Sequence, residues 1–337
     1  MPKSTQSIRT LAGQKIQHVV IILKENHTFD NYFGTFPGVE GTTMPRSPNP
    51  PLSDPDHRHG AWLTRKTTAV RQQFVEADIP AYFSYARQFT LCDHFFTDVA
   101  GPSTPNHLML VAADSPIIDN PRQGDQPMLS KSLPASLDRS GISWGNYGGY
   151  VFQYLAGIKT SSVFSSEQFK LDASSGSLPT VSWVFAPSQF DEHPPDSRRG
   201  PMGNVTTGSQ WTVDQINAIA TGRLWSNTAI FITWDDWGGW WDHVDPPSVE
   251  TWDLATPLPS YKGTQFRYGS RVGCLVLGPF AKRGHISKNL HSHVSLVKFV
   301  ETLFNLPPLN QRDANADNMS DCFDFNQNPS PPPSTSP

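Results

Sequence analysis

The sequence His18-Val-Val-Ile-Ile-Leu-Lys-Glu-Asn-His-Thr-Phe-Asp-Asn-Tyr-Phe-Gly34 contains the segment on which the predicted fold depends. Residues 19–23 form an uninterrupted apolar run rich in β-branched residues, which is typical of a strand buried on both faces of a parallel sheet. Glu25 and Asn26 follow this strand almost directly. Open α/β sheets bind ligands beyond the carboxyl ends of their strands, so these two side chains are candidate oxygen ligands of a divalent cation. The alternative is that they only end the strand and cap the next helix.

Further predicted strands and helices alternate along the chain, which indicates an α/β fold with a mostly parallel sheet. The predicted strands are 142–147, 181–185, 228–233 and 271–277, and the predicted helices are 75–90, 106–113, 130–140, 212–224 (with Thr212 as N-cap) and 293–306. Residues 35–68 are rich in Pro and form a long predicted loop that carries His57 and His59. We expect one domain over residues 17–325, after a polar lead-in at 1–16 and before a disordered Pro/Ser-rich tail at 326–337.

The composition excludes several classes of protein. The 337 residues carry a net charge of -4 without any long basic run, so nucleic acid is not an expected partner. No apolar run is long enough for a transmembrane segment, and no signal peptide is visible in the sequence. Cys92, Cys274 and Cys322 are far apart and no Cys-x-x-Cys occurs, so the spacing predicts neither a zinc knuckle nor a dithiol redox site, and at most one disulfide.

Carboxylates follow a second predicted strand. Asp235 and Asp236 come directly after the predicted strand 228–233 and its Trp234. Because parallel strands end at a common edge, Glu25 is expected to meet these two residues. Clustered carboxylates repel one another unless a cation or protons neutralise them, so we predict one divalent metal ion; oxygen ligands favour calcium, magnesium or manganese over zinc. The alternative is a strand-ending turn before a Gly pair.

A hydroxyl group and two histidines are candidate reacting groups. Ser103 and Thr104 precede a predicted helix that contains Asn106, and a helix N-terminus binds anions such as phosphate. A serine that contacts a metal there can act as a nucleophile, although either hydroxyl residue would also serve as a simple N-cap. His193 and His243 lie in loops after strands and are candidate proton donors, the alternative for each being a surface position.

Four motifs in sequence order resemble those of the bacterial phosphoesterase family of phospholipase C and acid phosphatase A. Residues 25–34 resemble the family signature Glu-Asn-Arg-Ser-Phe-Asp, and residues 101–107 resemble Thr/Ser-x-Pro-Asn-Arg. Residues 235–244 are similar to Asp-Glu/Asp-x-Gly-Gly-x-x-Asp-His-Val, and residues 271–325 to the closing segment of the family. His27 and His107 stand where the family usually has Arg.

This resemblance implies an alkaline-phosphatase-like fold, a three-layer αβα sandwich around a mostly parallel sheet. It also implies site residues. The implied metal ligands are Glu25, Asn26, Ser103, Asp235 and Asp236; the implied nucleophile is Ser103; the implied phosphate-binding residues are Asn26, Thr104 and Asn106; and the implied catalytic histidines are His193 and, in the shared motif, His243. The family further suggests a secreted or periplasmic location.

The expected function is that of a metal-dependent phosphoric ester hydrolase acting through a phosphoserine. An acid-phosphatase-like phosphomonoesterase is the first expectation, because Ser103 matches the phosphatase members and the C-terminal domains of larger phospholipases C are absent. The first alternative is a phospholipase C, favoured by the aromatic residues at 234–241, which would imply contact with a lipid surface. The second alternative is an inactive binding protein of the same fold, whose support is His27 and His107.

Overall fold

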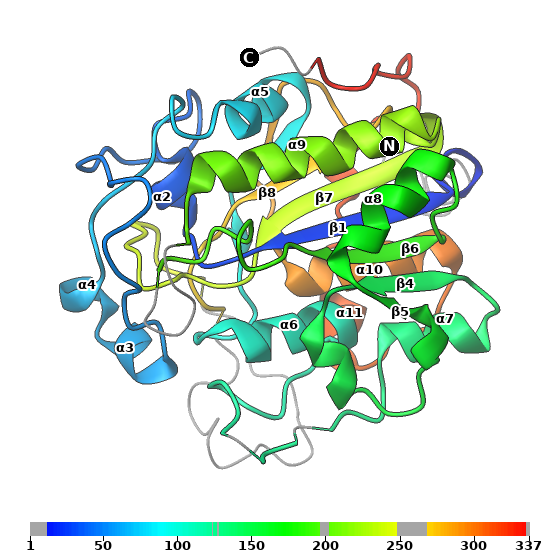
Figure 1. Cartoon of the computed structure of the whole chain (residues 1–337), viewed down its shortest axis with the longest axis horizontal. Coiled ribbons are helices and arrows are strands. Elements are labelled where there is room, and N and C mark those ends of the chain that lie inside the picture. Colours follow the sequence, from blue (N-terminus) through cyan, green and yellow to red (C-terminus); the bar gives the residue numbers. More distant parts are fainter. Residues whose placement is uncertain (1–11, 123, 127, 196–201, 248–267, 335–337) are drawn as a thin grey trace.

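An eight-stranded sheet lies at the centre of the computed structural model, which describes residues 12–122, 124–126, 128–195, 202–247 and 268–334 (Figure 1). The strand order is β5-β4-β6-β1-β7-β8-β2-β9. The strands are β1 (His18–Lys24), β2 (Thr90–Cys92), β4 (Trp144–Tyr147), β5 (Val163–Phe164), β6 (Val181–Phe185), β7 (Thr228–Trp234), β8 (Cys274–Leu277) and β9 (His285–Ser287). A small second sheet pairs β3 (Phe95–Phe96) with β10 (His291–Ser292).

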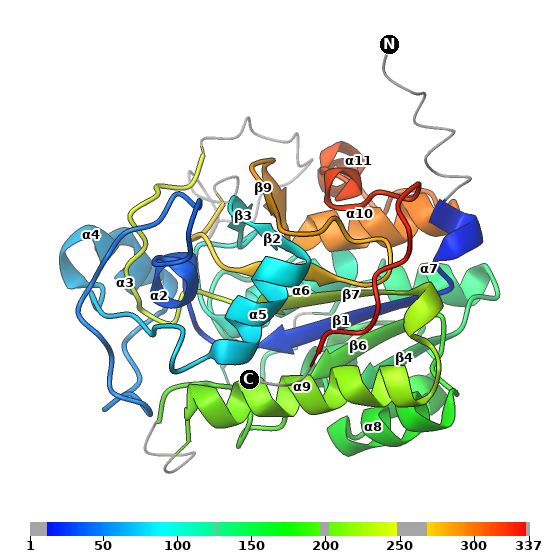
Figure 2. The same cartoon turned by 90° about the horizontal axis from the view of Figure 1, so that it is seen from above.

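Helices cover both faces of this sheet, which gives three layers (Figure 2). One face carries α5 (Pro80–Gln88), α8 (Ser166–Ser175) and α9 (Val205–Thr221), and the other carries α6 (Ser103–Ala112) and α10 (His293–Phe304). The remaining α-helices of the described residues are α2 (Phe29–Phe33), α3 (His59–Leu63), α4 (Arg65–Thr68), α7 (Leu133–Arg139) and α11 (Gln311–Asn315). The predicted αβα sandwich is confirmed.

The central strand β1 is fully enclosed because strands flank it and helices cover it. It pairs in parallel with β6 and with β7, and its residues 19–23 are buried. The sheet is mostly parallel, as predicted, but β8 runs antiparallel to both of its neighbours, β7 and β2. The register pairs Leu23 with Phe185 and Lys24 with Trp234, so the loops after three strands leave the sheet side by side.

The predicted starts of several helices are wrong, and that of α9 has the largest error. Helix α9 begins at Val205, and its N-cap is Asn204, whose side chain accepts a hydrogen bond from the Thr207 amide. Thr212, the predicted cap, lies inside the helix and donates its hydroxyl to the carbonyl oxygen of Gly208 at 3.3 Å. Thr and Gly are weak helix formers, so the first two turns carry little sequence signal. Helix α6 likewise begins three residues before its predicted start.

The described part of the tail contradicts the prediction of disorder. The Trp225 indole donates to the carbonyl oxygen of Ser330 at 2.8 Å, and Gln327 Nε2 donates to that of Pro279 at 3.0 Å. Residues 335–337 lie outside the described residues, as do residues 1–11 of the predicted lead-in. Ala12 and Ile16 are buried in the core, so the described part of the lead-in also belongs to the domain.

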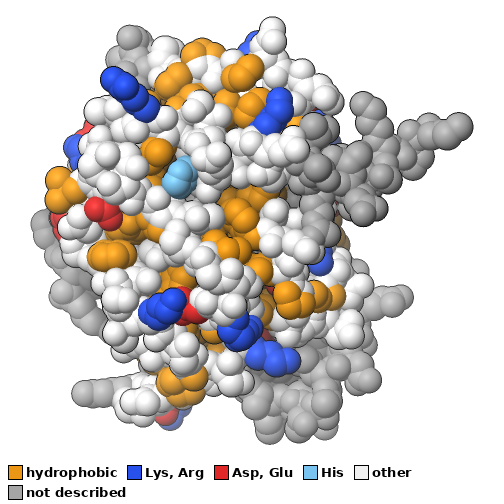
Figure 3. Space-filling model, turned by 90° about the vertical axis from the view of Figure 1, so that its right-hand side faces the viewer, with side chains coloured by type: hydrophobic (Ala, Val, Ile, Leu, Met, Phe, Trp, Pro, Cys, Tyr) orange, Lys and Arg blue, Asp and Glu red, His pale blue; other side chains and the backbone are white. Residues whose placement is uncertain are grey.

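The surface beside α7 and α8 has a mixed character. Figure 3 shows this face, where hydrophobic side chains are interspersed with isolated charged side chains of both signs. None of the described helices has the length and the apolar composition that crossing a membrane requires.

Candidate active site

The loop after β1 turns sharply because one residue adopts a left-handed conformation. Asn26 has φ 67°, which Asn tolerates better than most residues. Its backbone amide donates to Asp235 Oδ1 at 2.9 Å, and this hydrogen bond joins the loop after β1 to the loop after β7. Gly238 packs directly on this turn, since a Cβ there would lie 2.1 Å from the Asn26 carbonyl oxygen. Gly238 is therefore required by the close approach of these two loops, whereas a Cβ at Gly239 would lie 2.5 Å from the Cβ of Pro55 in another loop.

Three potential ligand groups converge at this edge of the sheet. Glu25, His107 and Asp235 each offer an atom, and these atoms lie within 4.8 Å of one another. His107 Nε2 donates to Asp235 Oδ2 at 3.1 Å, while Ser103 Oγ donates to Asp236 Oδ2 at 3.1 Å. The structure thus brings together carboxylates that the sequence placed after two separate strands. It also adds His107, which sequence reasoning treated only as a replaced Arg.

The two adjacent aspartates experience opposite electrostatic effects. Burial would raise the pKa of Asp235, but His107, the Asn26 amide and Ser103 lower it to about 2. Burial raises the pKa of Asp236 well above its usual range, and the charges of Asp235 and Glu25 raise it further. His107 therefore stabilises the charged form of Asp235, whereas the charged form of Asp236 remains destabilised.

These residues fit a divalent cation. The side-chain oxygen Oδ1 of Asn26 is buried and has no hydrogen-bond partner among the described residues. Beside it lie the buried carboxylates of Asp235 and Asp236 and the partly buried one of Glu25. Oxygen donors with excess negative charge favour magnesium, calcium or manganese, and the additional imidazole of His107 is also compatible with manganese or zinc.

Ser103 is the first residue of α6, and Asn106 holds the loop that precedes it. Asn106 Nδ2 donates to the carbonyl oxygens of Val99, Gly101 and Pro102, and its Oδ1 accepts from the Val99 amide at 2.9 Å. The amide group expected to contact phosphate is therefore occupied within the loop. This arrangement makes Asn106 a residue that positions Ser103.

The polar groups of Thr104 are also occupied. Its hydroxyl lies 2.8 Å from the hydroxyl of Tyr150, and its amide donates to Asn120 Oδ1 at 2.8 Å. The Tyr150 ring lies 5.3 Å, centroid to centroid, from the ring of His107, which pairs with Asp235. Tyr150 begins the 3₁₀ helix η1 (Tyr150–Tyr154), and 42% of its surface is exposed, so its ring reaches from the site to solvent.

His193 lies close to His57, a histidine that the sequence analysis did not assign to the site. His193, His57 and Asp54 offer ligand or proton-transfer atoms within 4.8 Å of one another. His57 Nδ1 donates to the Pro55 carbonyl at 2.8 Å, so His57 Nε2 accepts from Asn26 Nδ2 at 3.3 Å. The only signal for His57 was its position in a long loop.

The His193 ring has a defined orientation. Its Nδ1 donates to the carbonyl oxygen of Pro194 at 2.7 Å, which leaves Nε2 as the nitrogen able to take or give a proton. The loop is fixed by its neighbour Glu192, which forms a fully buried ion pair with Lys24 at 3.1 Å and accepts hydrogen bonds from Tyr32 and Trp234.

His27 has a packing role at the position where the family usually has Arg. Its ring stacks on Tyr32 with a centroid distance of 4.4 Å. Its two nitrogens face Asn31 Oδ1 at 2.6 Å and the Glu192 carbonyl oxygen at 3.0 Å. Burial lowers the pKa of His27 to about 4. The ring thus connects the signature loop to the loop that carries His193.

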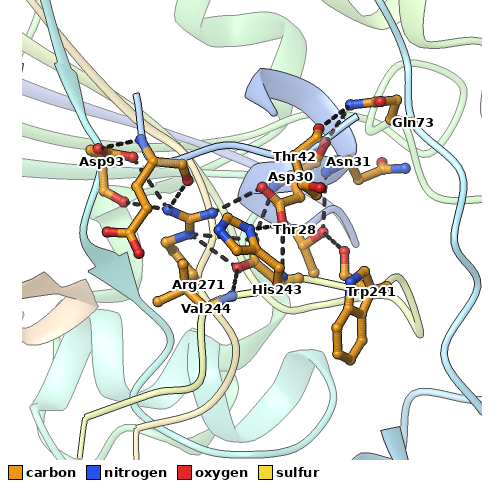
Figure 4. Close-up of polar contacts among 12 residues, drawn as sticks. Thr28, Asp30, Asn31, Thr42, Gln73, Asp93, Trp241, His243, Val244 and Arg271 are labelled. Atoms are coloured by element: carbon orange, nitrogen blue, oxygen red, sulfur yellow. Dashed lines mark hydrogen bonds and ion pairs between the residues drawn. The ribbon is translucent and has the colours of Figure 1, made fainter. Parts of the chain in front are cut away.

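His243 lies in a different polar cluster, shown in Figure 4. Its Nδ1 is 2.6 Å from Asp30 Oδ2, and its backbone amide donates to the same oxygen at 2.7 Å. Within the described part of the chain its hydrogen bonds go to Asp30, which does not take part in the carboxylate cluster. The structure therefore does not bring His243 together with the other predicted catalytic residues.

A buried arginine is the centre of this second cluster (Figure 4). The Arg271 guanidinium has no exposed surface and pairs with Asp30 at 3.0 Å, Asp93 at 3.2 Å and Asp242 at 3.1 Å. Lys288 forms a further ion pair with Asp93. Burial raises the pKa of Asp242 to about 6, although the charge of Arg271 acts in the opposite direction. We call these residues the Arg271 cluster.

Comparison with known proteins agrees with the motifs. The model of the Phosphoesterase family matches residues 16–54 and 54–307. The chain belongs to the Phosphoesterase family. Its curated relatives include a non-hemolytic phospholipase C of Pseudomonas aeruginosa, 26% identical over 96% of this chain and 60% of the relative, and phospholipase C B of Mycobacterium tuberculosis, 25% identical over 94% and 79%. A non-specific phospholipase C1 of Arabidopsis thaliana is 26% identical over 97% and 75%.

These relatives make the family one of phosphoric ester hydrolases, but the chain is shorter than several of them. It spans 60% of the Pseudomonas protein and 56% of a Burkholderia pseudomallei non-hemolytic phospholipase C. Among solved structures, a sulfatase from Pseudoalteromonas has a TM-score of 0.51 at 10% identity, covering 94% of this chain and 77% of that chain. The lipoteichoic acid synthase LtaP of Listeria monocytogenes has 0.50 at 8% identity, covering 94% and 82%. These similarities show that the chain shares its fold with these two enzymes.

Proposed function

We propose that this member of the Phosphoesterase family hydrolyses phosphoric esters through a covalent phosphoserine at Ser103. The observation that carries the proposal is the position of Ser103. Its Oγ lies 3.1 Å from Asp236 Oδ2, at the N-terminus of α6 and beside the cluster of Glu25, His107 and Asp235. A hydroxyl in this position combines a nucleophile with a helix end that favours anions.

The residues around Ser103 have different proposed roles. Asp236 accepts the hydrogen of the Ser103 hydroxyl, which directs a lone pair of the oxygen away from the carboxylates and toward substrate. Asn106 and Thr104 hold the loop and the first turn of α6 in place. Glu25, Asn26, Asp235 and Asp236 would hold a divalent cation, whose charge would favour the serine alkoxide and offset the negative charge of the phosphate.

The proposed reaction proceeds in two displacements. In the first displacement the Ser103 hydroxyl passes its proton to Asp236, its oxygen forms a bond to phosphorus as the bond to the leaving alkoxide breaks, and His193 Nε2 gives that alkoxide a proton. In the second, water attacks the phosphoserine, the bond between phosphorus and the serine oxygen breaks, His193 takes a proton from the water, and Asp236 returns its proton to the serine oxygen. Positioning and electrostatic stabilisation supply most of the rate in phosphoryl transfer.

Two substrate classes have specific support. Serine at position 103 matches the phosphatase members of the family, which favours monoesters as in the original expectation. The printed names of the reported relatives, all phospholipases C, favour phosphodiesters of lipids. The partly exposed ring of Tyr150 beside the carboxylates offers an apolar surface for the alcohol group in either case.

A substrate panel tests the proposal. p-Nitrophenyl phosphate, bis-p-nitrophenyl phosphate and phosphatidylcholine vesicles are each assayed with and without chelator and with added manganese, magnesium or calcium. Metal-dependent turnover of the monoester in preference to the other two supports a phosphatase, and preference for phosphatidylcholine supports a phospholipase C. No turnover of any substrate with any metal would contradict the proposal and favour a binding protein of the same fold.

A further inference from the structure

The cysteines of the chain, which are far apart in sequence, meet in the structure. Cys92 in β2 is the register partner of Cys274 in β8, and Cys322 Sγ lies 3.7 Å from Cys92 Sγ. All three thiols are buried, and none forms a disulfide. The sequence spacing argued against a thiol site, but the fold brings strand β2 and the 3₁₀ helix η5 (Ser320–Cys322) together on one side of the sheet.

An imidazole and a carboxylate complete a group of four side chains with the thiols of Cys92 and Cys322. His291 Nε2 lies 4.0 Å from Cys322 Sγ and 3.3 Å from Asp321 Oδ1. Cys322 Sγ lies 3.7 Å from the same oxygen of Asp321. The ligand atoms of Cys92, His291 and Cys322 all lie within 4.8 Å of one another.

Four of these separations are close to the edges of a coordination tetrahedron. Zinc lies about 2.3 Å from sulfur and about 2.0–2.2 Å from nitrogen or oxygen. In a regular tetrahedron these bond lengths give edges of about 3.75 Å between two sulfurs, about 3.55 Å between sulfur and nitrogen or oxygen, and about 3.4 Å between nitrogen and oxygen. Four of the six separations are 3.7, 4.0, 3.7 and 3.3 Å, which depart from these edges by less than half an ångström. Cys92 Sγ lies within 4.8 Å of a His291 nitrogen, whereas Asp321 lies outside the group formed by Cys92, His291 and Cys322, so its carboxylate would approach Cys92 when the ion binds.

The surroundings of His291 strengthen the comparison with metal sites. Its other nitrogen, Nδ1, lies 3.0 Å from Asp317 Oδ1. Metal-binding histidines commonly present their second nitrogen to a carboxylate, which fixes the ring and directs the first nitrogen toward the metal. Asp317 and Asp321 are partly exposed, with 33% and 23% of their side chains accessible, so an ion can reach the buried thiols from this side.

We propose that Cys92, His291, Asp321 and Cys322 form a second metal site, for a thiophilic divalent cation such as zinc. The ion would connect β2, β10 and η5 and thereby fix the C-terminal segment to the sheet. Its ligands differ in kind from those of the candidate active site, which contains no sulfur, so the two sites are expected to select different ions. Both thiols lose their protons on binding.

A disulfide between Cys92 and Cys322 is the main competing interpretation. It would use only the two thiols and would not involve His291, whose Nε2 also lies 3.0 Å from Ser287 Oγ, or the carboxylates beside it. It would also require an oxidant, whereas metal binding requires none. Counting free thiols in the denatured, unreduced protein separates the two: the metal site predicts three and the disulfide predicts one.

Cobalt substitution tests the proposal without reference to activity. The full chain is stripped of metal under reducing conditions and titrated with Co²⁺, and the intense thiolate-to-cobalt absorption in the near ultraviolet is recorded. We expect one equivalent of cobalt to produce this absorption and one equivalent of zinc to abolish it. Absence of the absorption in the folded wild-type protein, or recovery of one free thiol, would overturn the proposal, whatever the variants do.

Variants of the proposed ligands test whether these side chains produce the cobalt absorption. Cys322→Ser and Asp321→Asn are expected to remove or strongly weaken it, and the partly exposed Asp321 provides a variant expected to fold. Cys274→Ser is the matched control, because Cys274 is a buried thiol next to Cys92 that is outside the four ligands. Glu25→Gln alters only the candidate active site and should keep the absorption. Retention of the full absorption in folded Asp321→Asn and Cys322→Ser would refute the assignment.

Discussion

The candidate active site and the Arg271 cluster are two buried groups of carboxylates built from the same two segments of the chain. The segment after β1 gives Glu25 to the first and Asp30 to the second. The segment after β7 gives Asp235 to the first and Asp242 to the second. The difference is the source of positive charge. In the Arg271 cluster the chain itself supplies a guanidinium and an ammonium, whereas in the candidate site His107 is the one basic side chain, among the described residues, that pairs with an aspartate.

This difference separates a structural cluster from a functional one. Carboxylates that are paired with buried cations hold two loops in fixed positions, and breaking such a pair is costly. A carboxylate whose charged form is disfavoured by burial and by neighbouring carboxylates, such as that of Asp236, destabilises the folded chain until a ligand neutralises it, a cost often found at functional sites. We therefore expect changes in the Arg271 cluster to affect stability and changes in the candidate active site to affect activity.

The largest effect is expected for Ser103→Ala. If Ser103 is the nucleophile, kcat with p-nitrophenyl phosphate should fall by about 10⁴-fold or more, with little change in the unfolding free energy. Acid quenching during turnover, followed by mass spectrometry, should find phosphate on Ser103 in the wild-type protein.

Thr104→Ala is the control for that variant. Its hydroxyl contacts Tyr150 and not the carboxylates, so we expect a loss of at most about tenfold from the altered packing. Phosphate trapped on Thr104 or on a histidine would contradict the assignment of Ser103.

His193→Ala and His243→Ala should differ in their dependence on the leaving group. Loss of a general acid costs roughly 10²–10⁴-fold, and most for a strongly basic leaving alkoxide. His193→Ala should therefore slow an alkyl phosphate much more than p-nitrophenyl phosphate, whereas His243→Ala should slow both by the same small factor. Equal losses for both substrates in His193→Ala would remove His193 from this role.

Arg271→Met should lower the unfolding free energy by about 3–5 kcal/mol, because it leaves three buried carboxylates without their shared cation. Urea denaturation followed by tryptophan fluorescence measures this loss. Arg58→Met is a matched control, since Arg58 pairs with Asp56 at an exposed position where an ion pair contributes little. Similar losses for both variants would show that the Arg271 cluster is not a stabilising centre.

In the metal-free protein, Asp236→Asn should raise the unfolding free energy, whereas Arg271→Met should lower it. The raised pKa of Asp236 means that its charged form costs stability at neutral pH, so a neutral amide should raise the unfolding free energy at pH 7 by about 1–2 kcal/mol. Added metal should make the wild type the more stable of the two proteins, because the ion is expected to stabilise only the wild type. Thermal unfolding with chelator and with manganese checks both parts, and an Asp236→Asn protein that is less stable in chelator would contradict the electrostatic argument.

The smallest effect is a pH dependence in the Arg271 cluster. The pKa of Asp242 is raised to about 6 from 3.8. Between these pH values the Asp242 carboxyl is mostly deprotonated in the unfolded chain but mostly protonated in the folded protein. Stability from this group is therefore complete below about pH 4 and is lost as the pH rises through 6. The advantage of wild type over Asp242→Asn should shrink by about 1 kcal/mol or more between pH 4 and pH 7; a constant difference would contradict the raised pKa.

The sequence predicted the features that depend on local pattern. The apolar run at 19–23 and the carboxylates after two strands were sufficient to predict a parallel sheet with Glu25 near Asp235, because strand direction alone brings these positions to one edge. The position of Ser103 before a predicted helix made it a candidate nucleophile, and the family resemblance favoured it over a simple N-cap. The antiparallel direction of β8 was not predictable in the same way, since four buried residues carry no mark of direction.

What the sequence did not predict depends on contacts between distant segments. The roles of Asn106 and His57 follow from where the backbone carbonyls of other loops lie, and no spacing encodes that. The meeting of Cys92 with Cys322, and the ordered packing of Ser330 against Trp225, join positions more than 100 residues apart. A Pro-rich composition predicts a lack of regular structure, but it does not exclude a fixed path across the surface.

The sheet order has a consequence for synthesis of the chain. Strand β1 is translated first, but its two neighbours in the sheet, β6 and β7, begin at residues 181 and 228. The apolar residues of β1 must therefore wait for most of the polypeptide to leave the ribosome before native pairing can protect them. Such late, long-range pairing slows folding and exposes hydrophobic segments to aggregation. Newly made chains should accordingly depend on chaperones until β7 has been released.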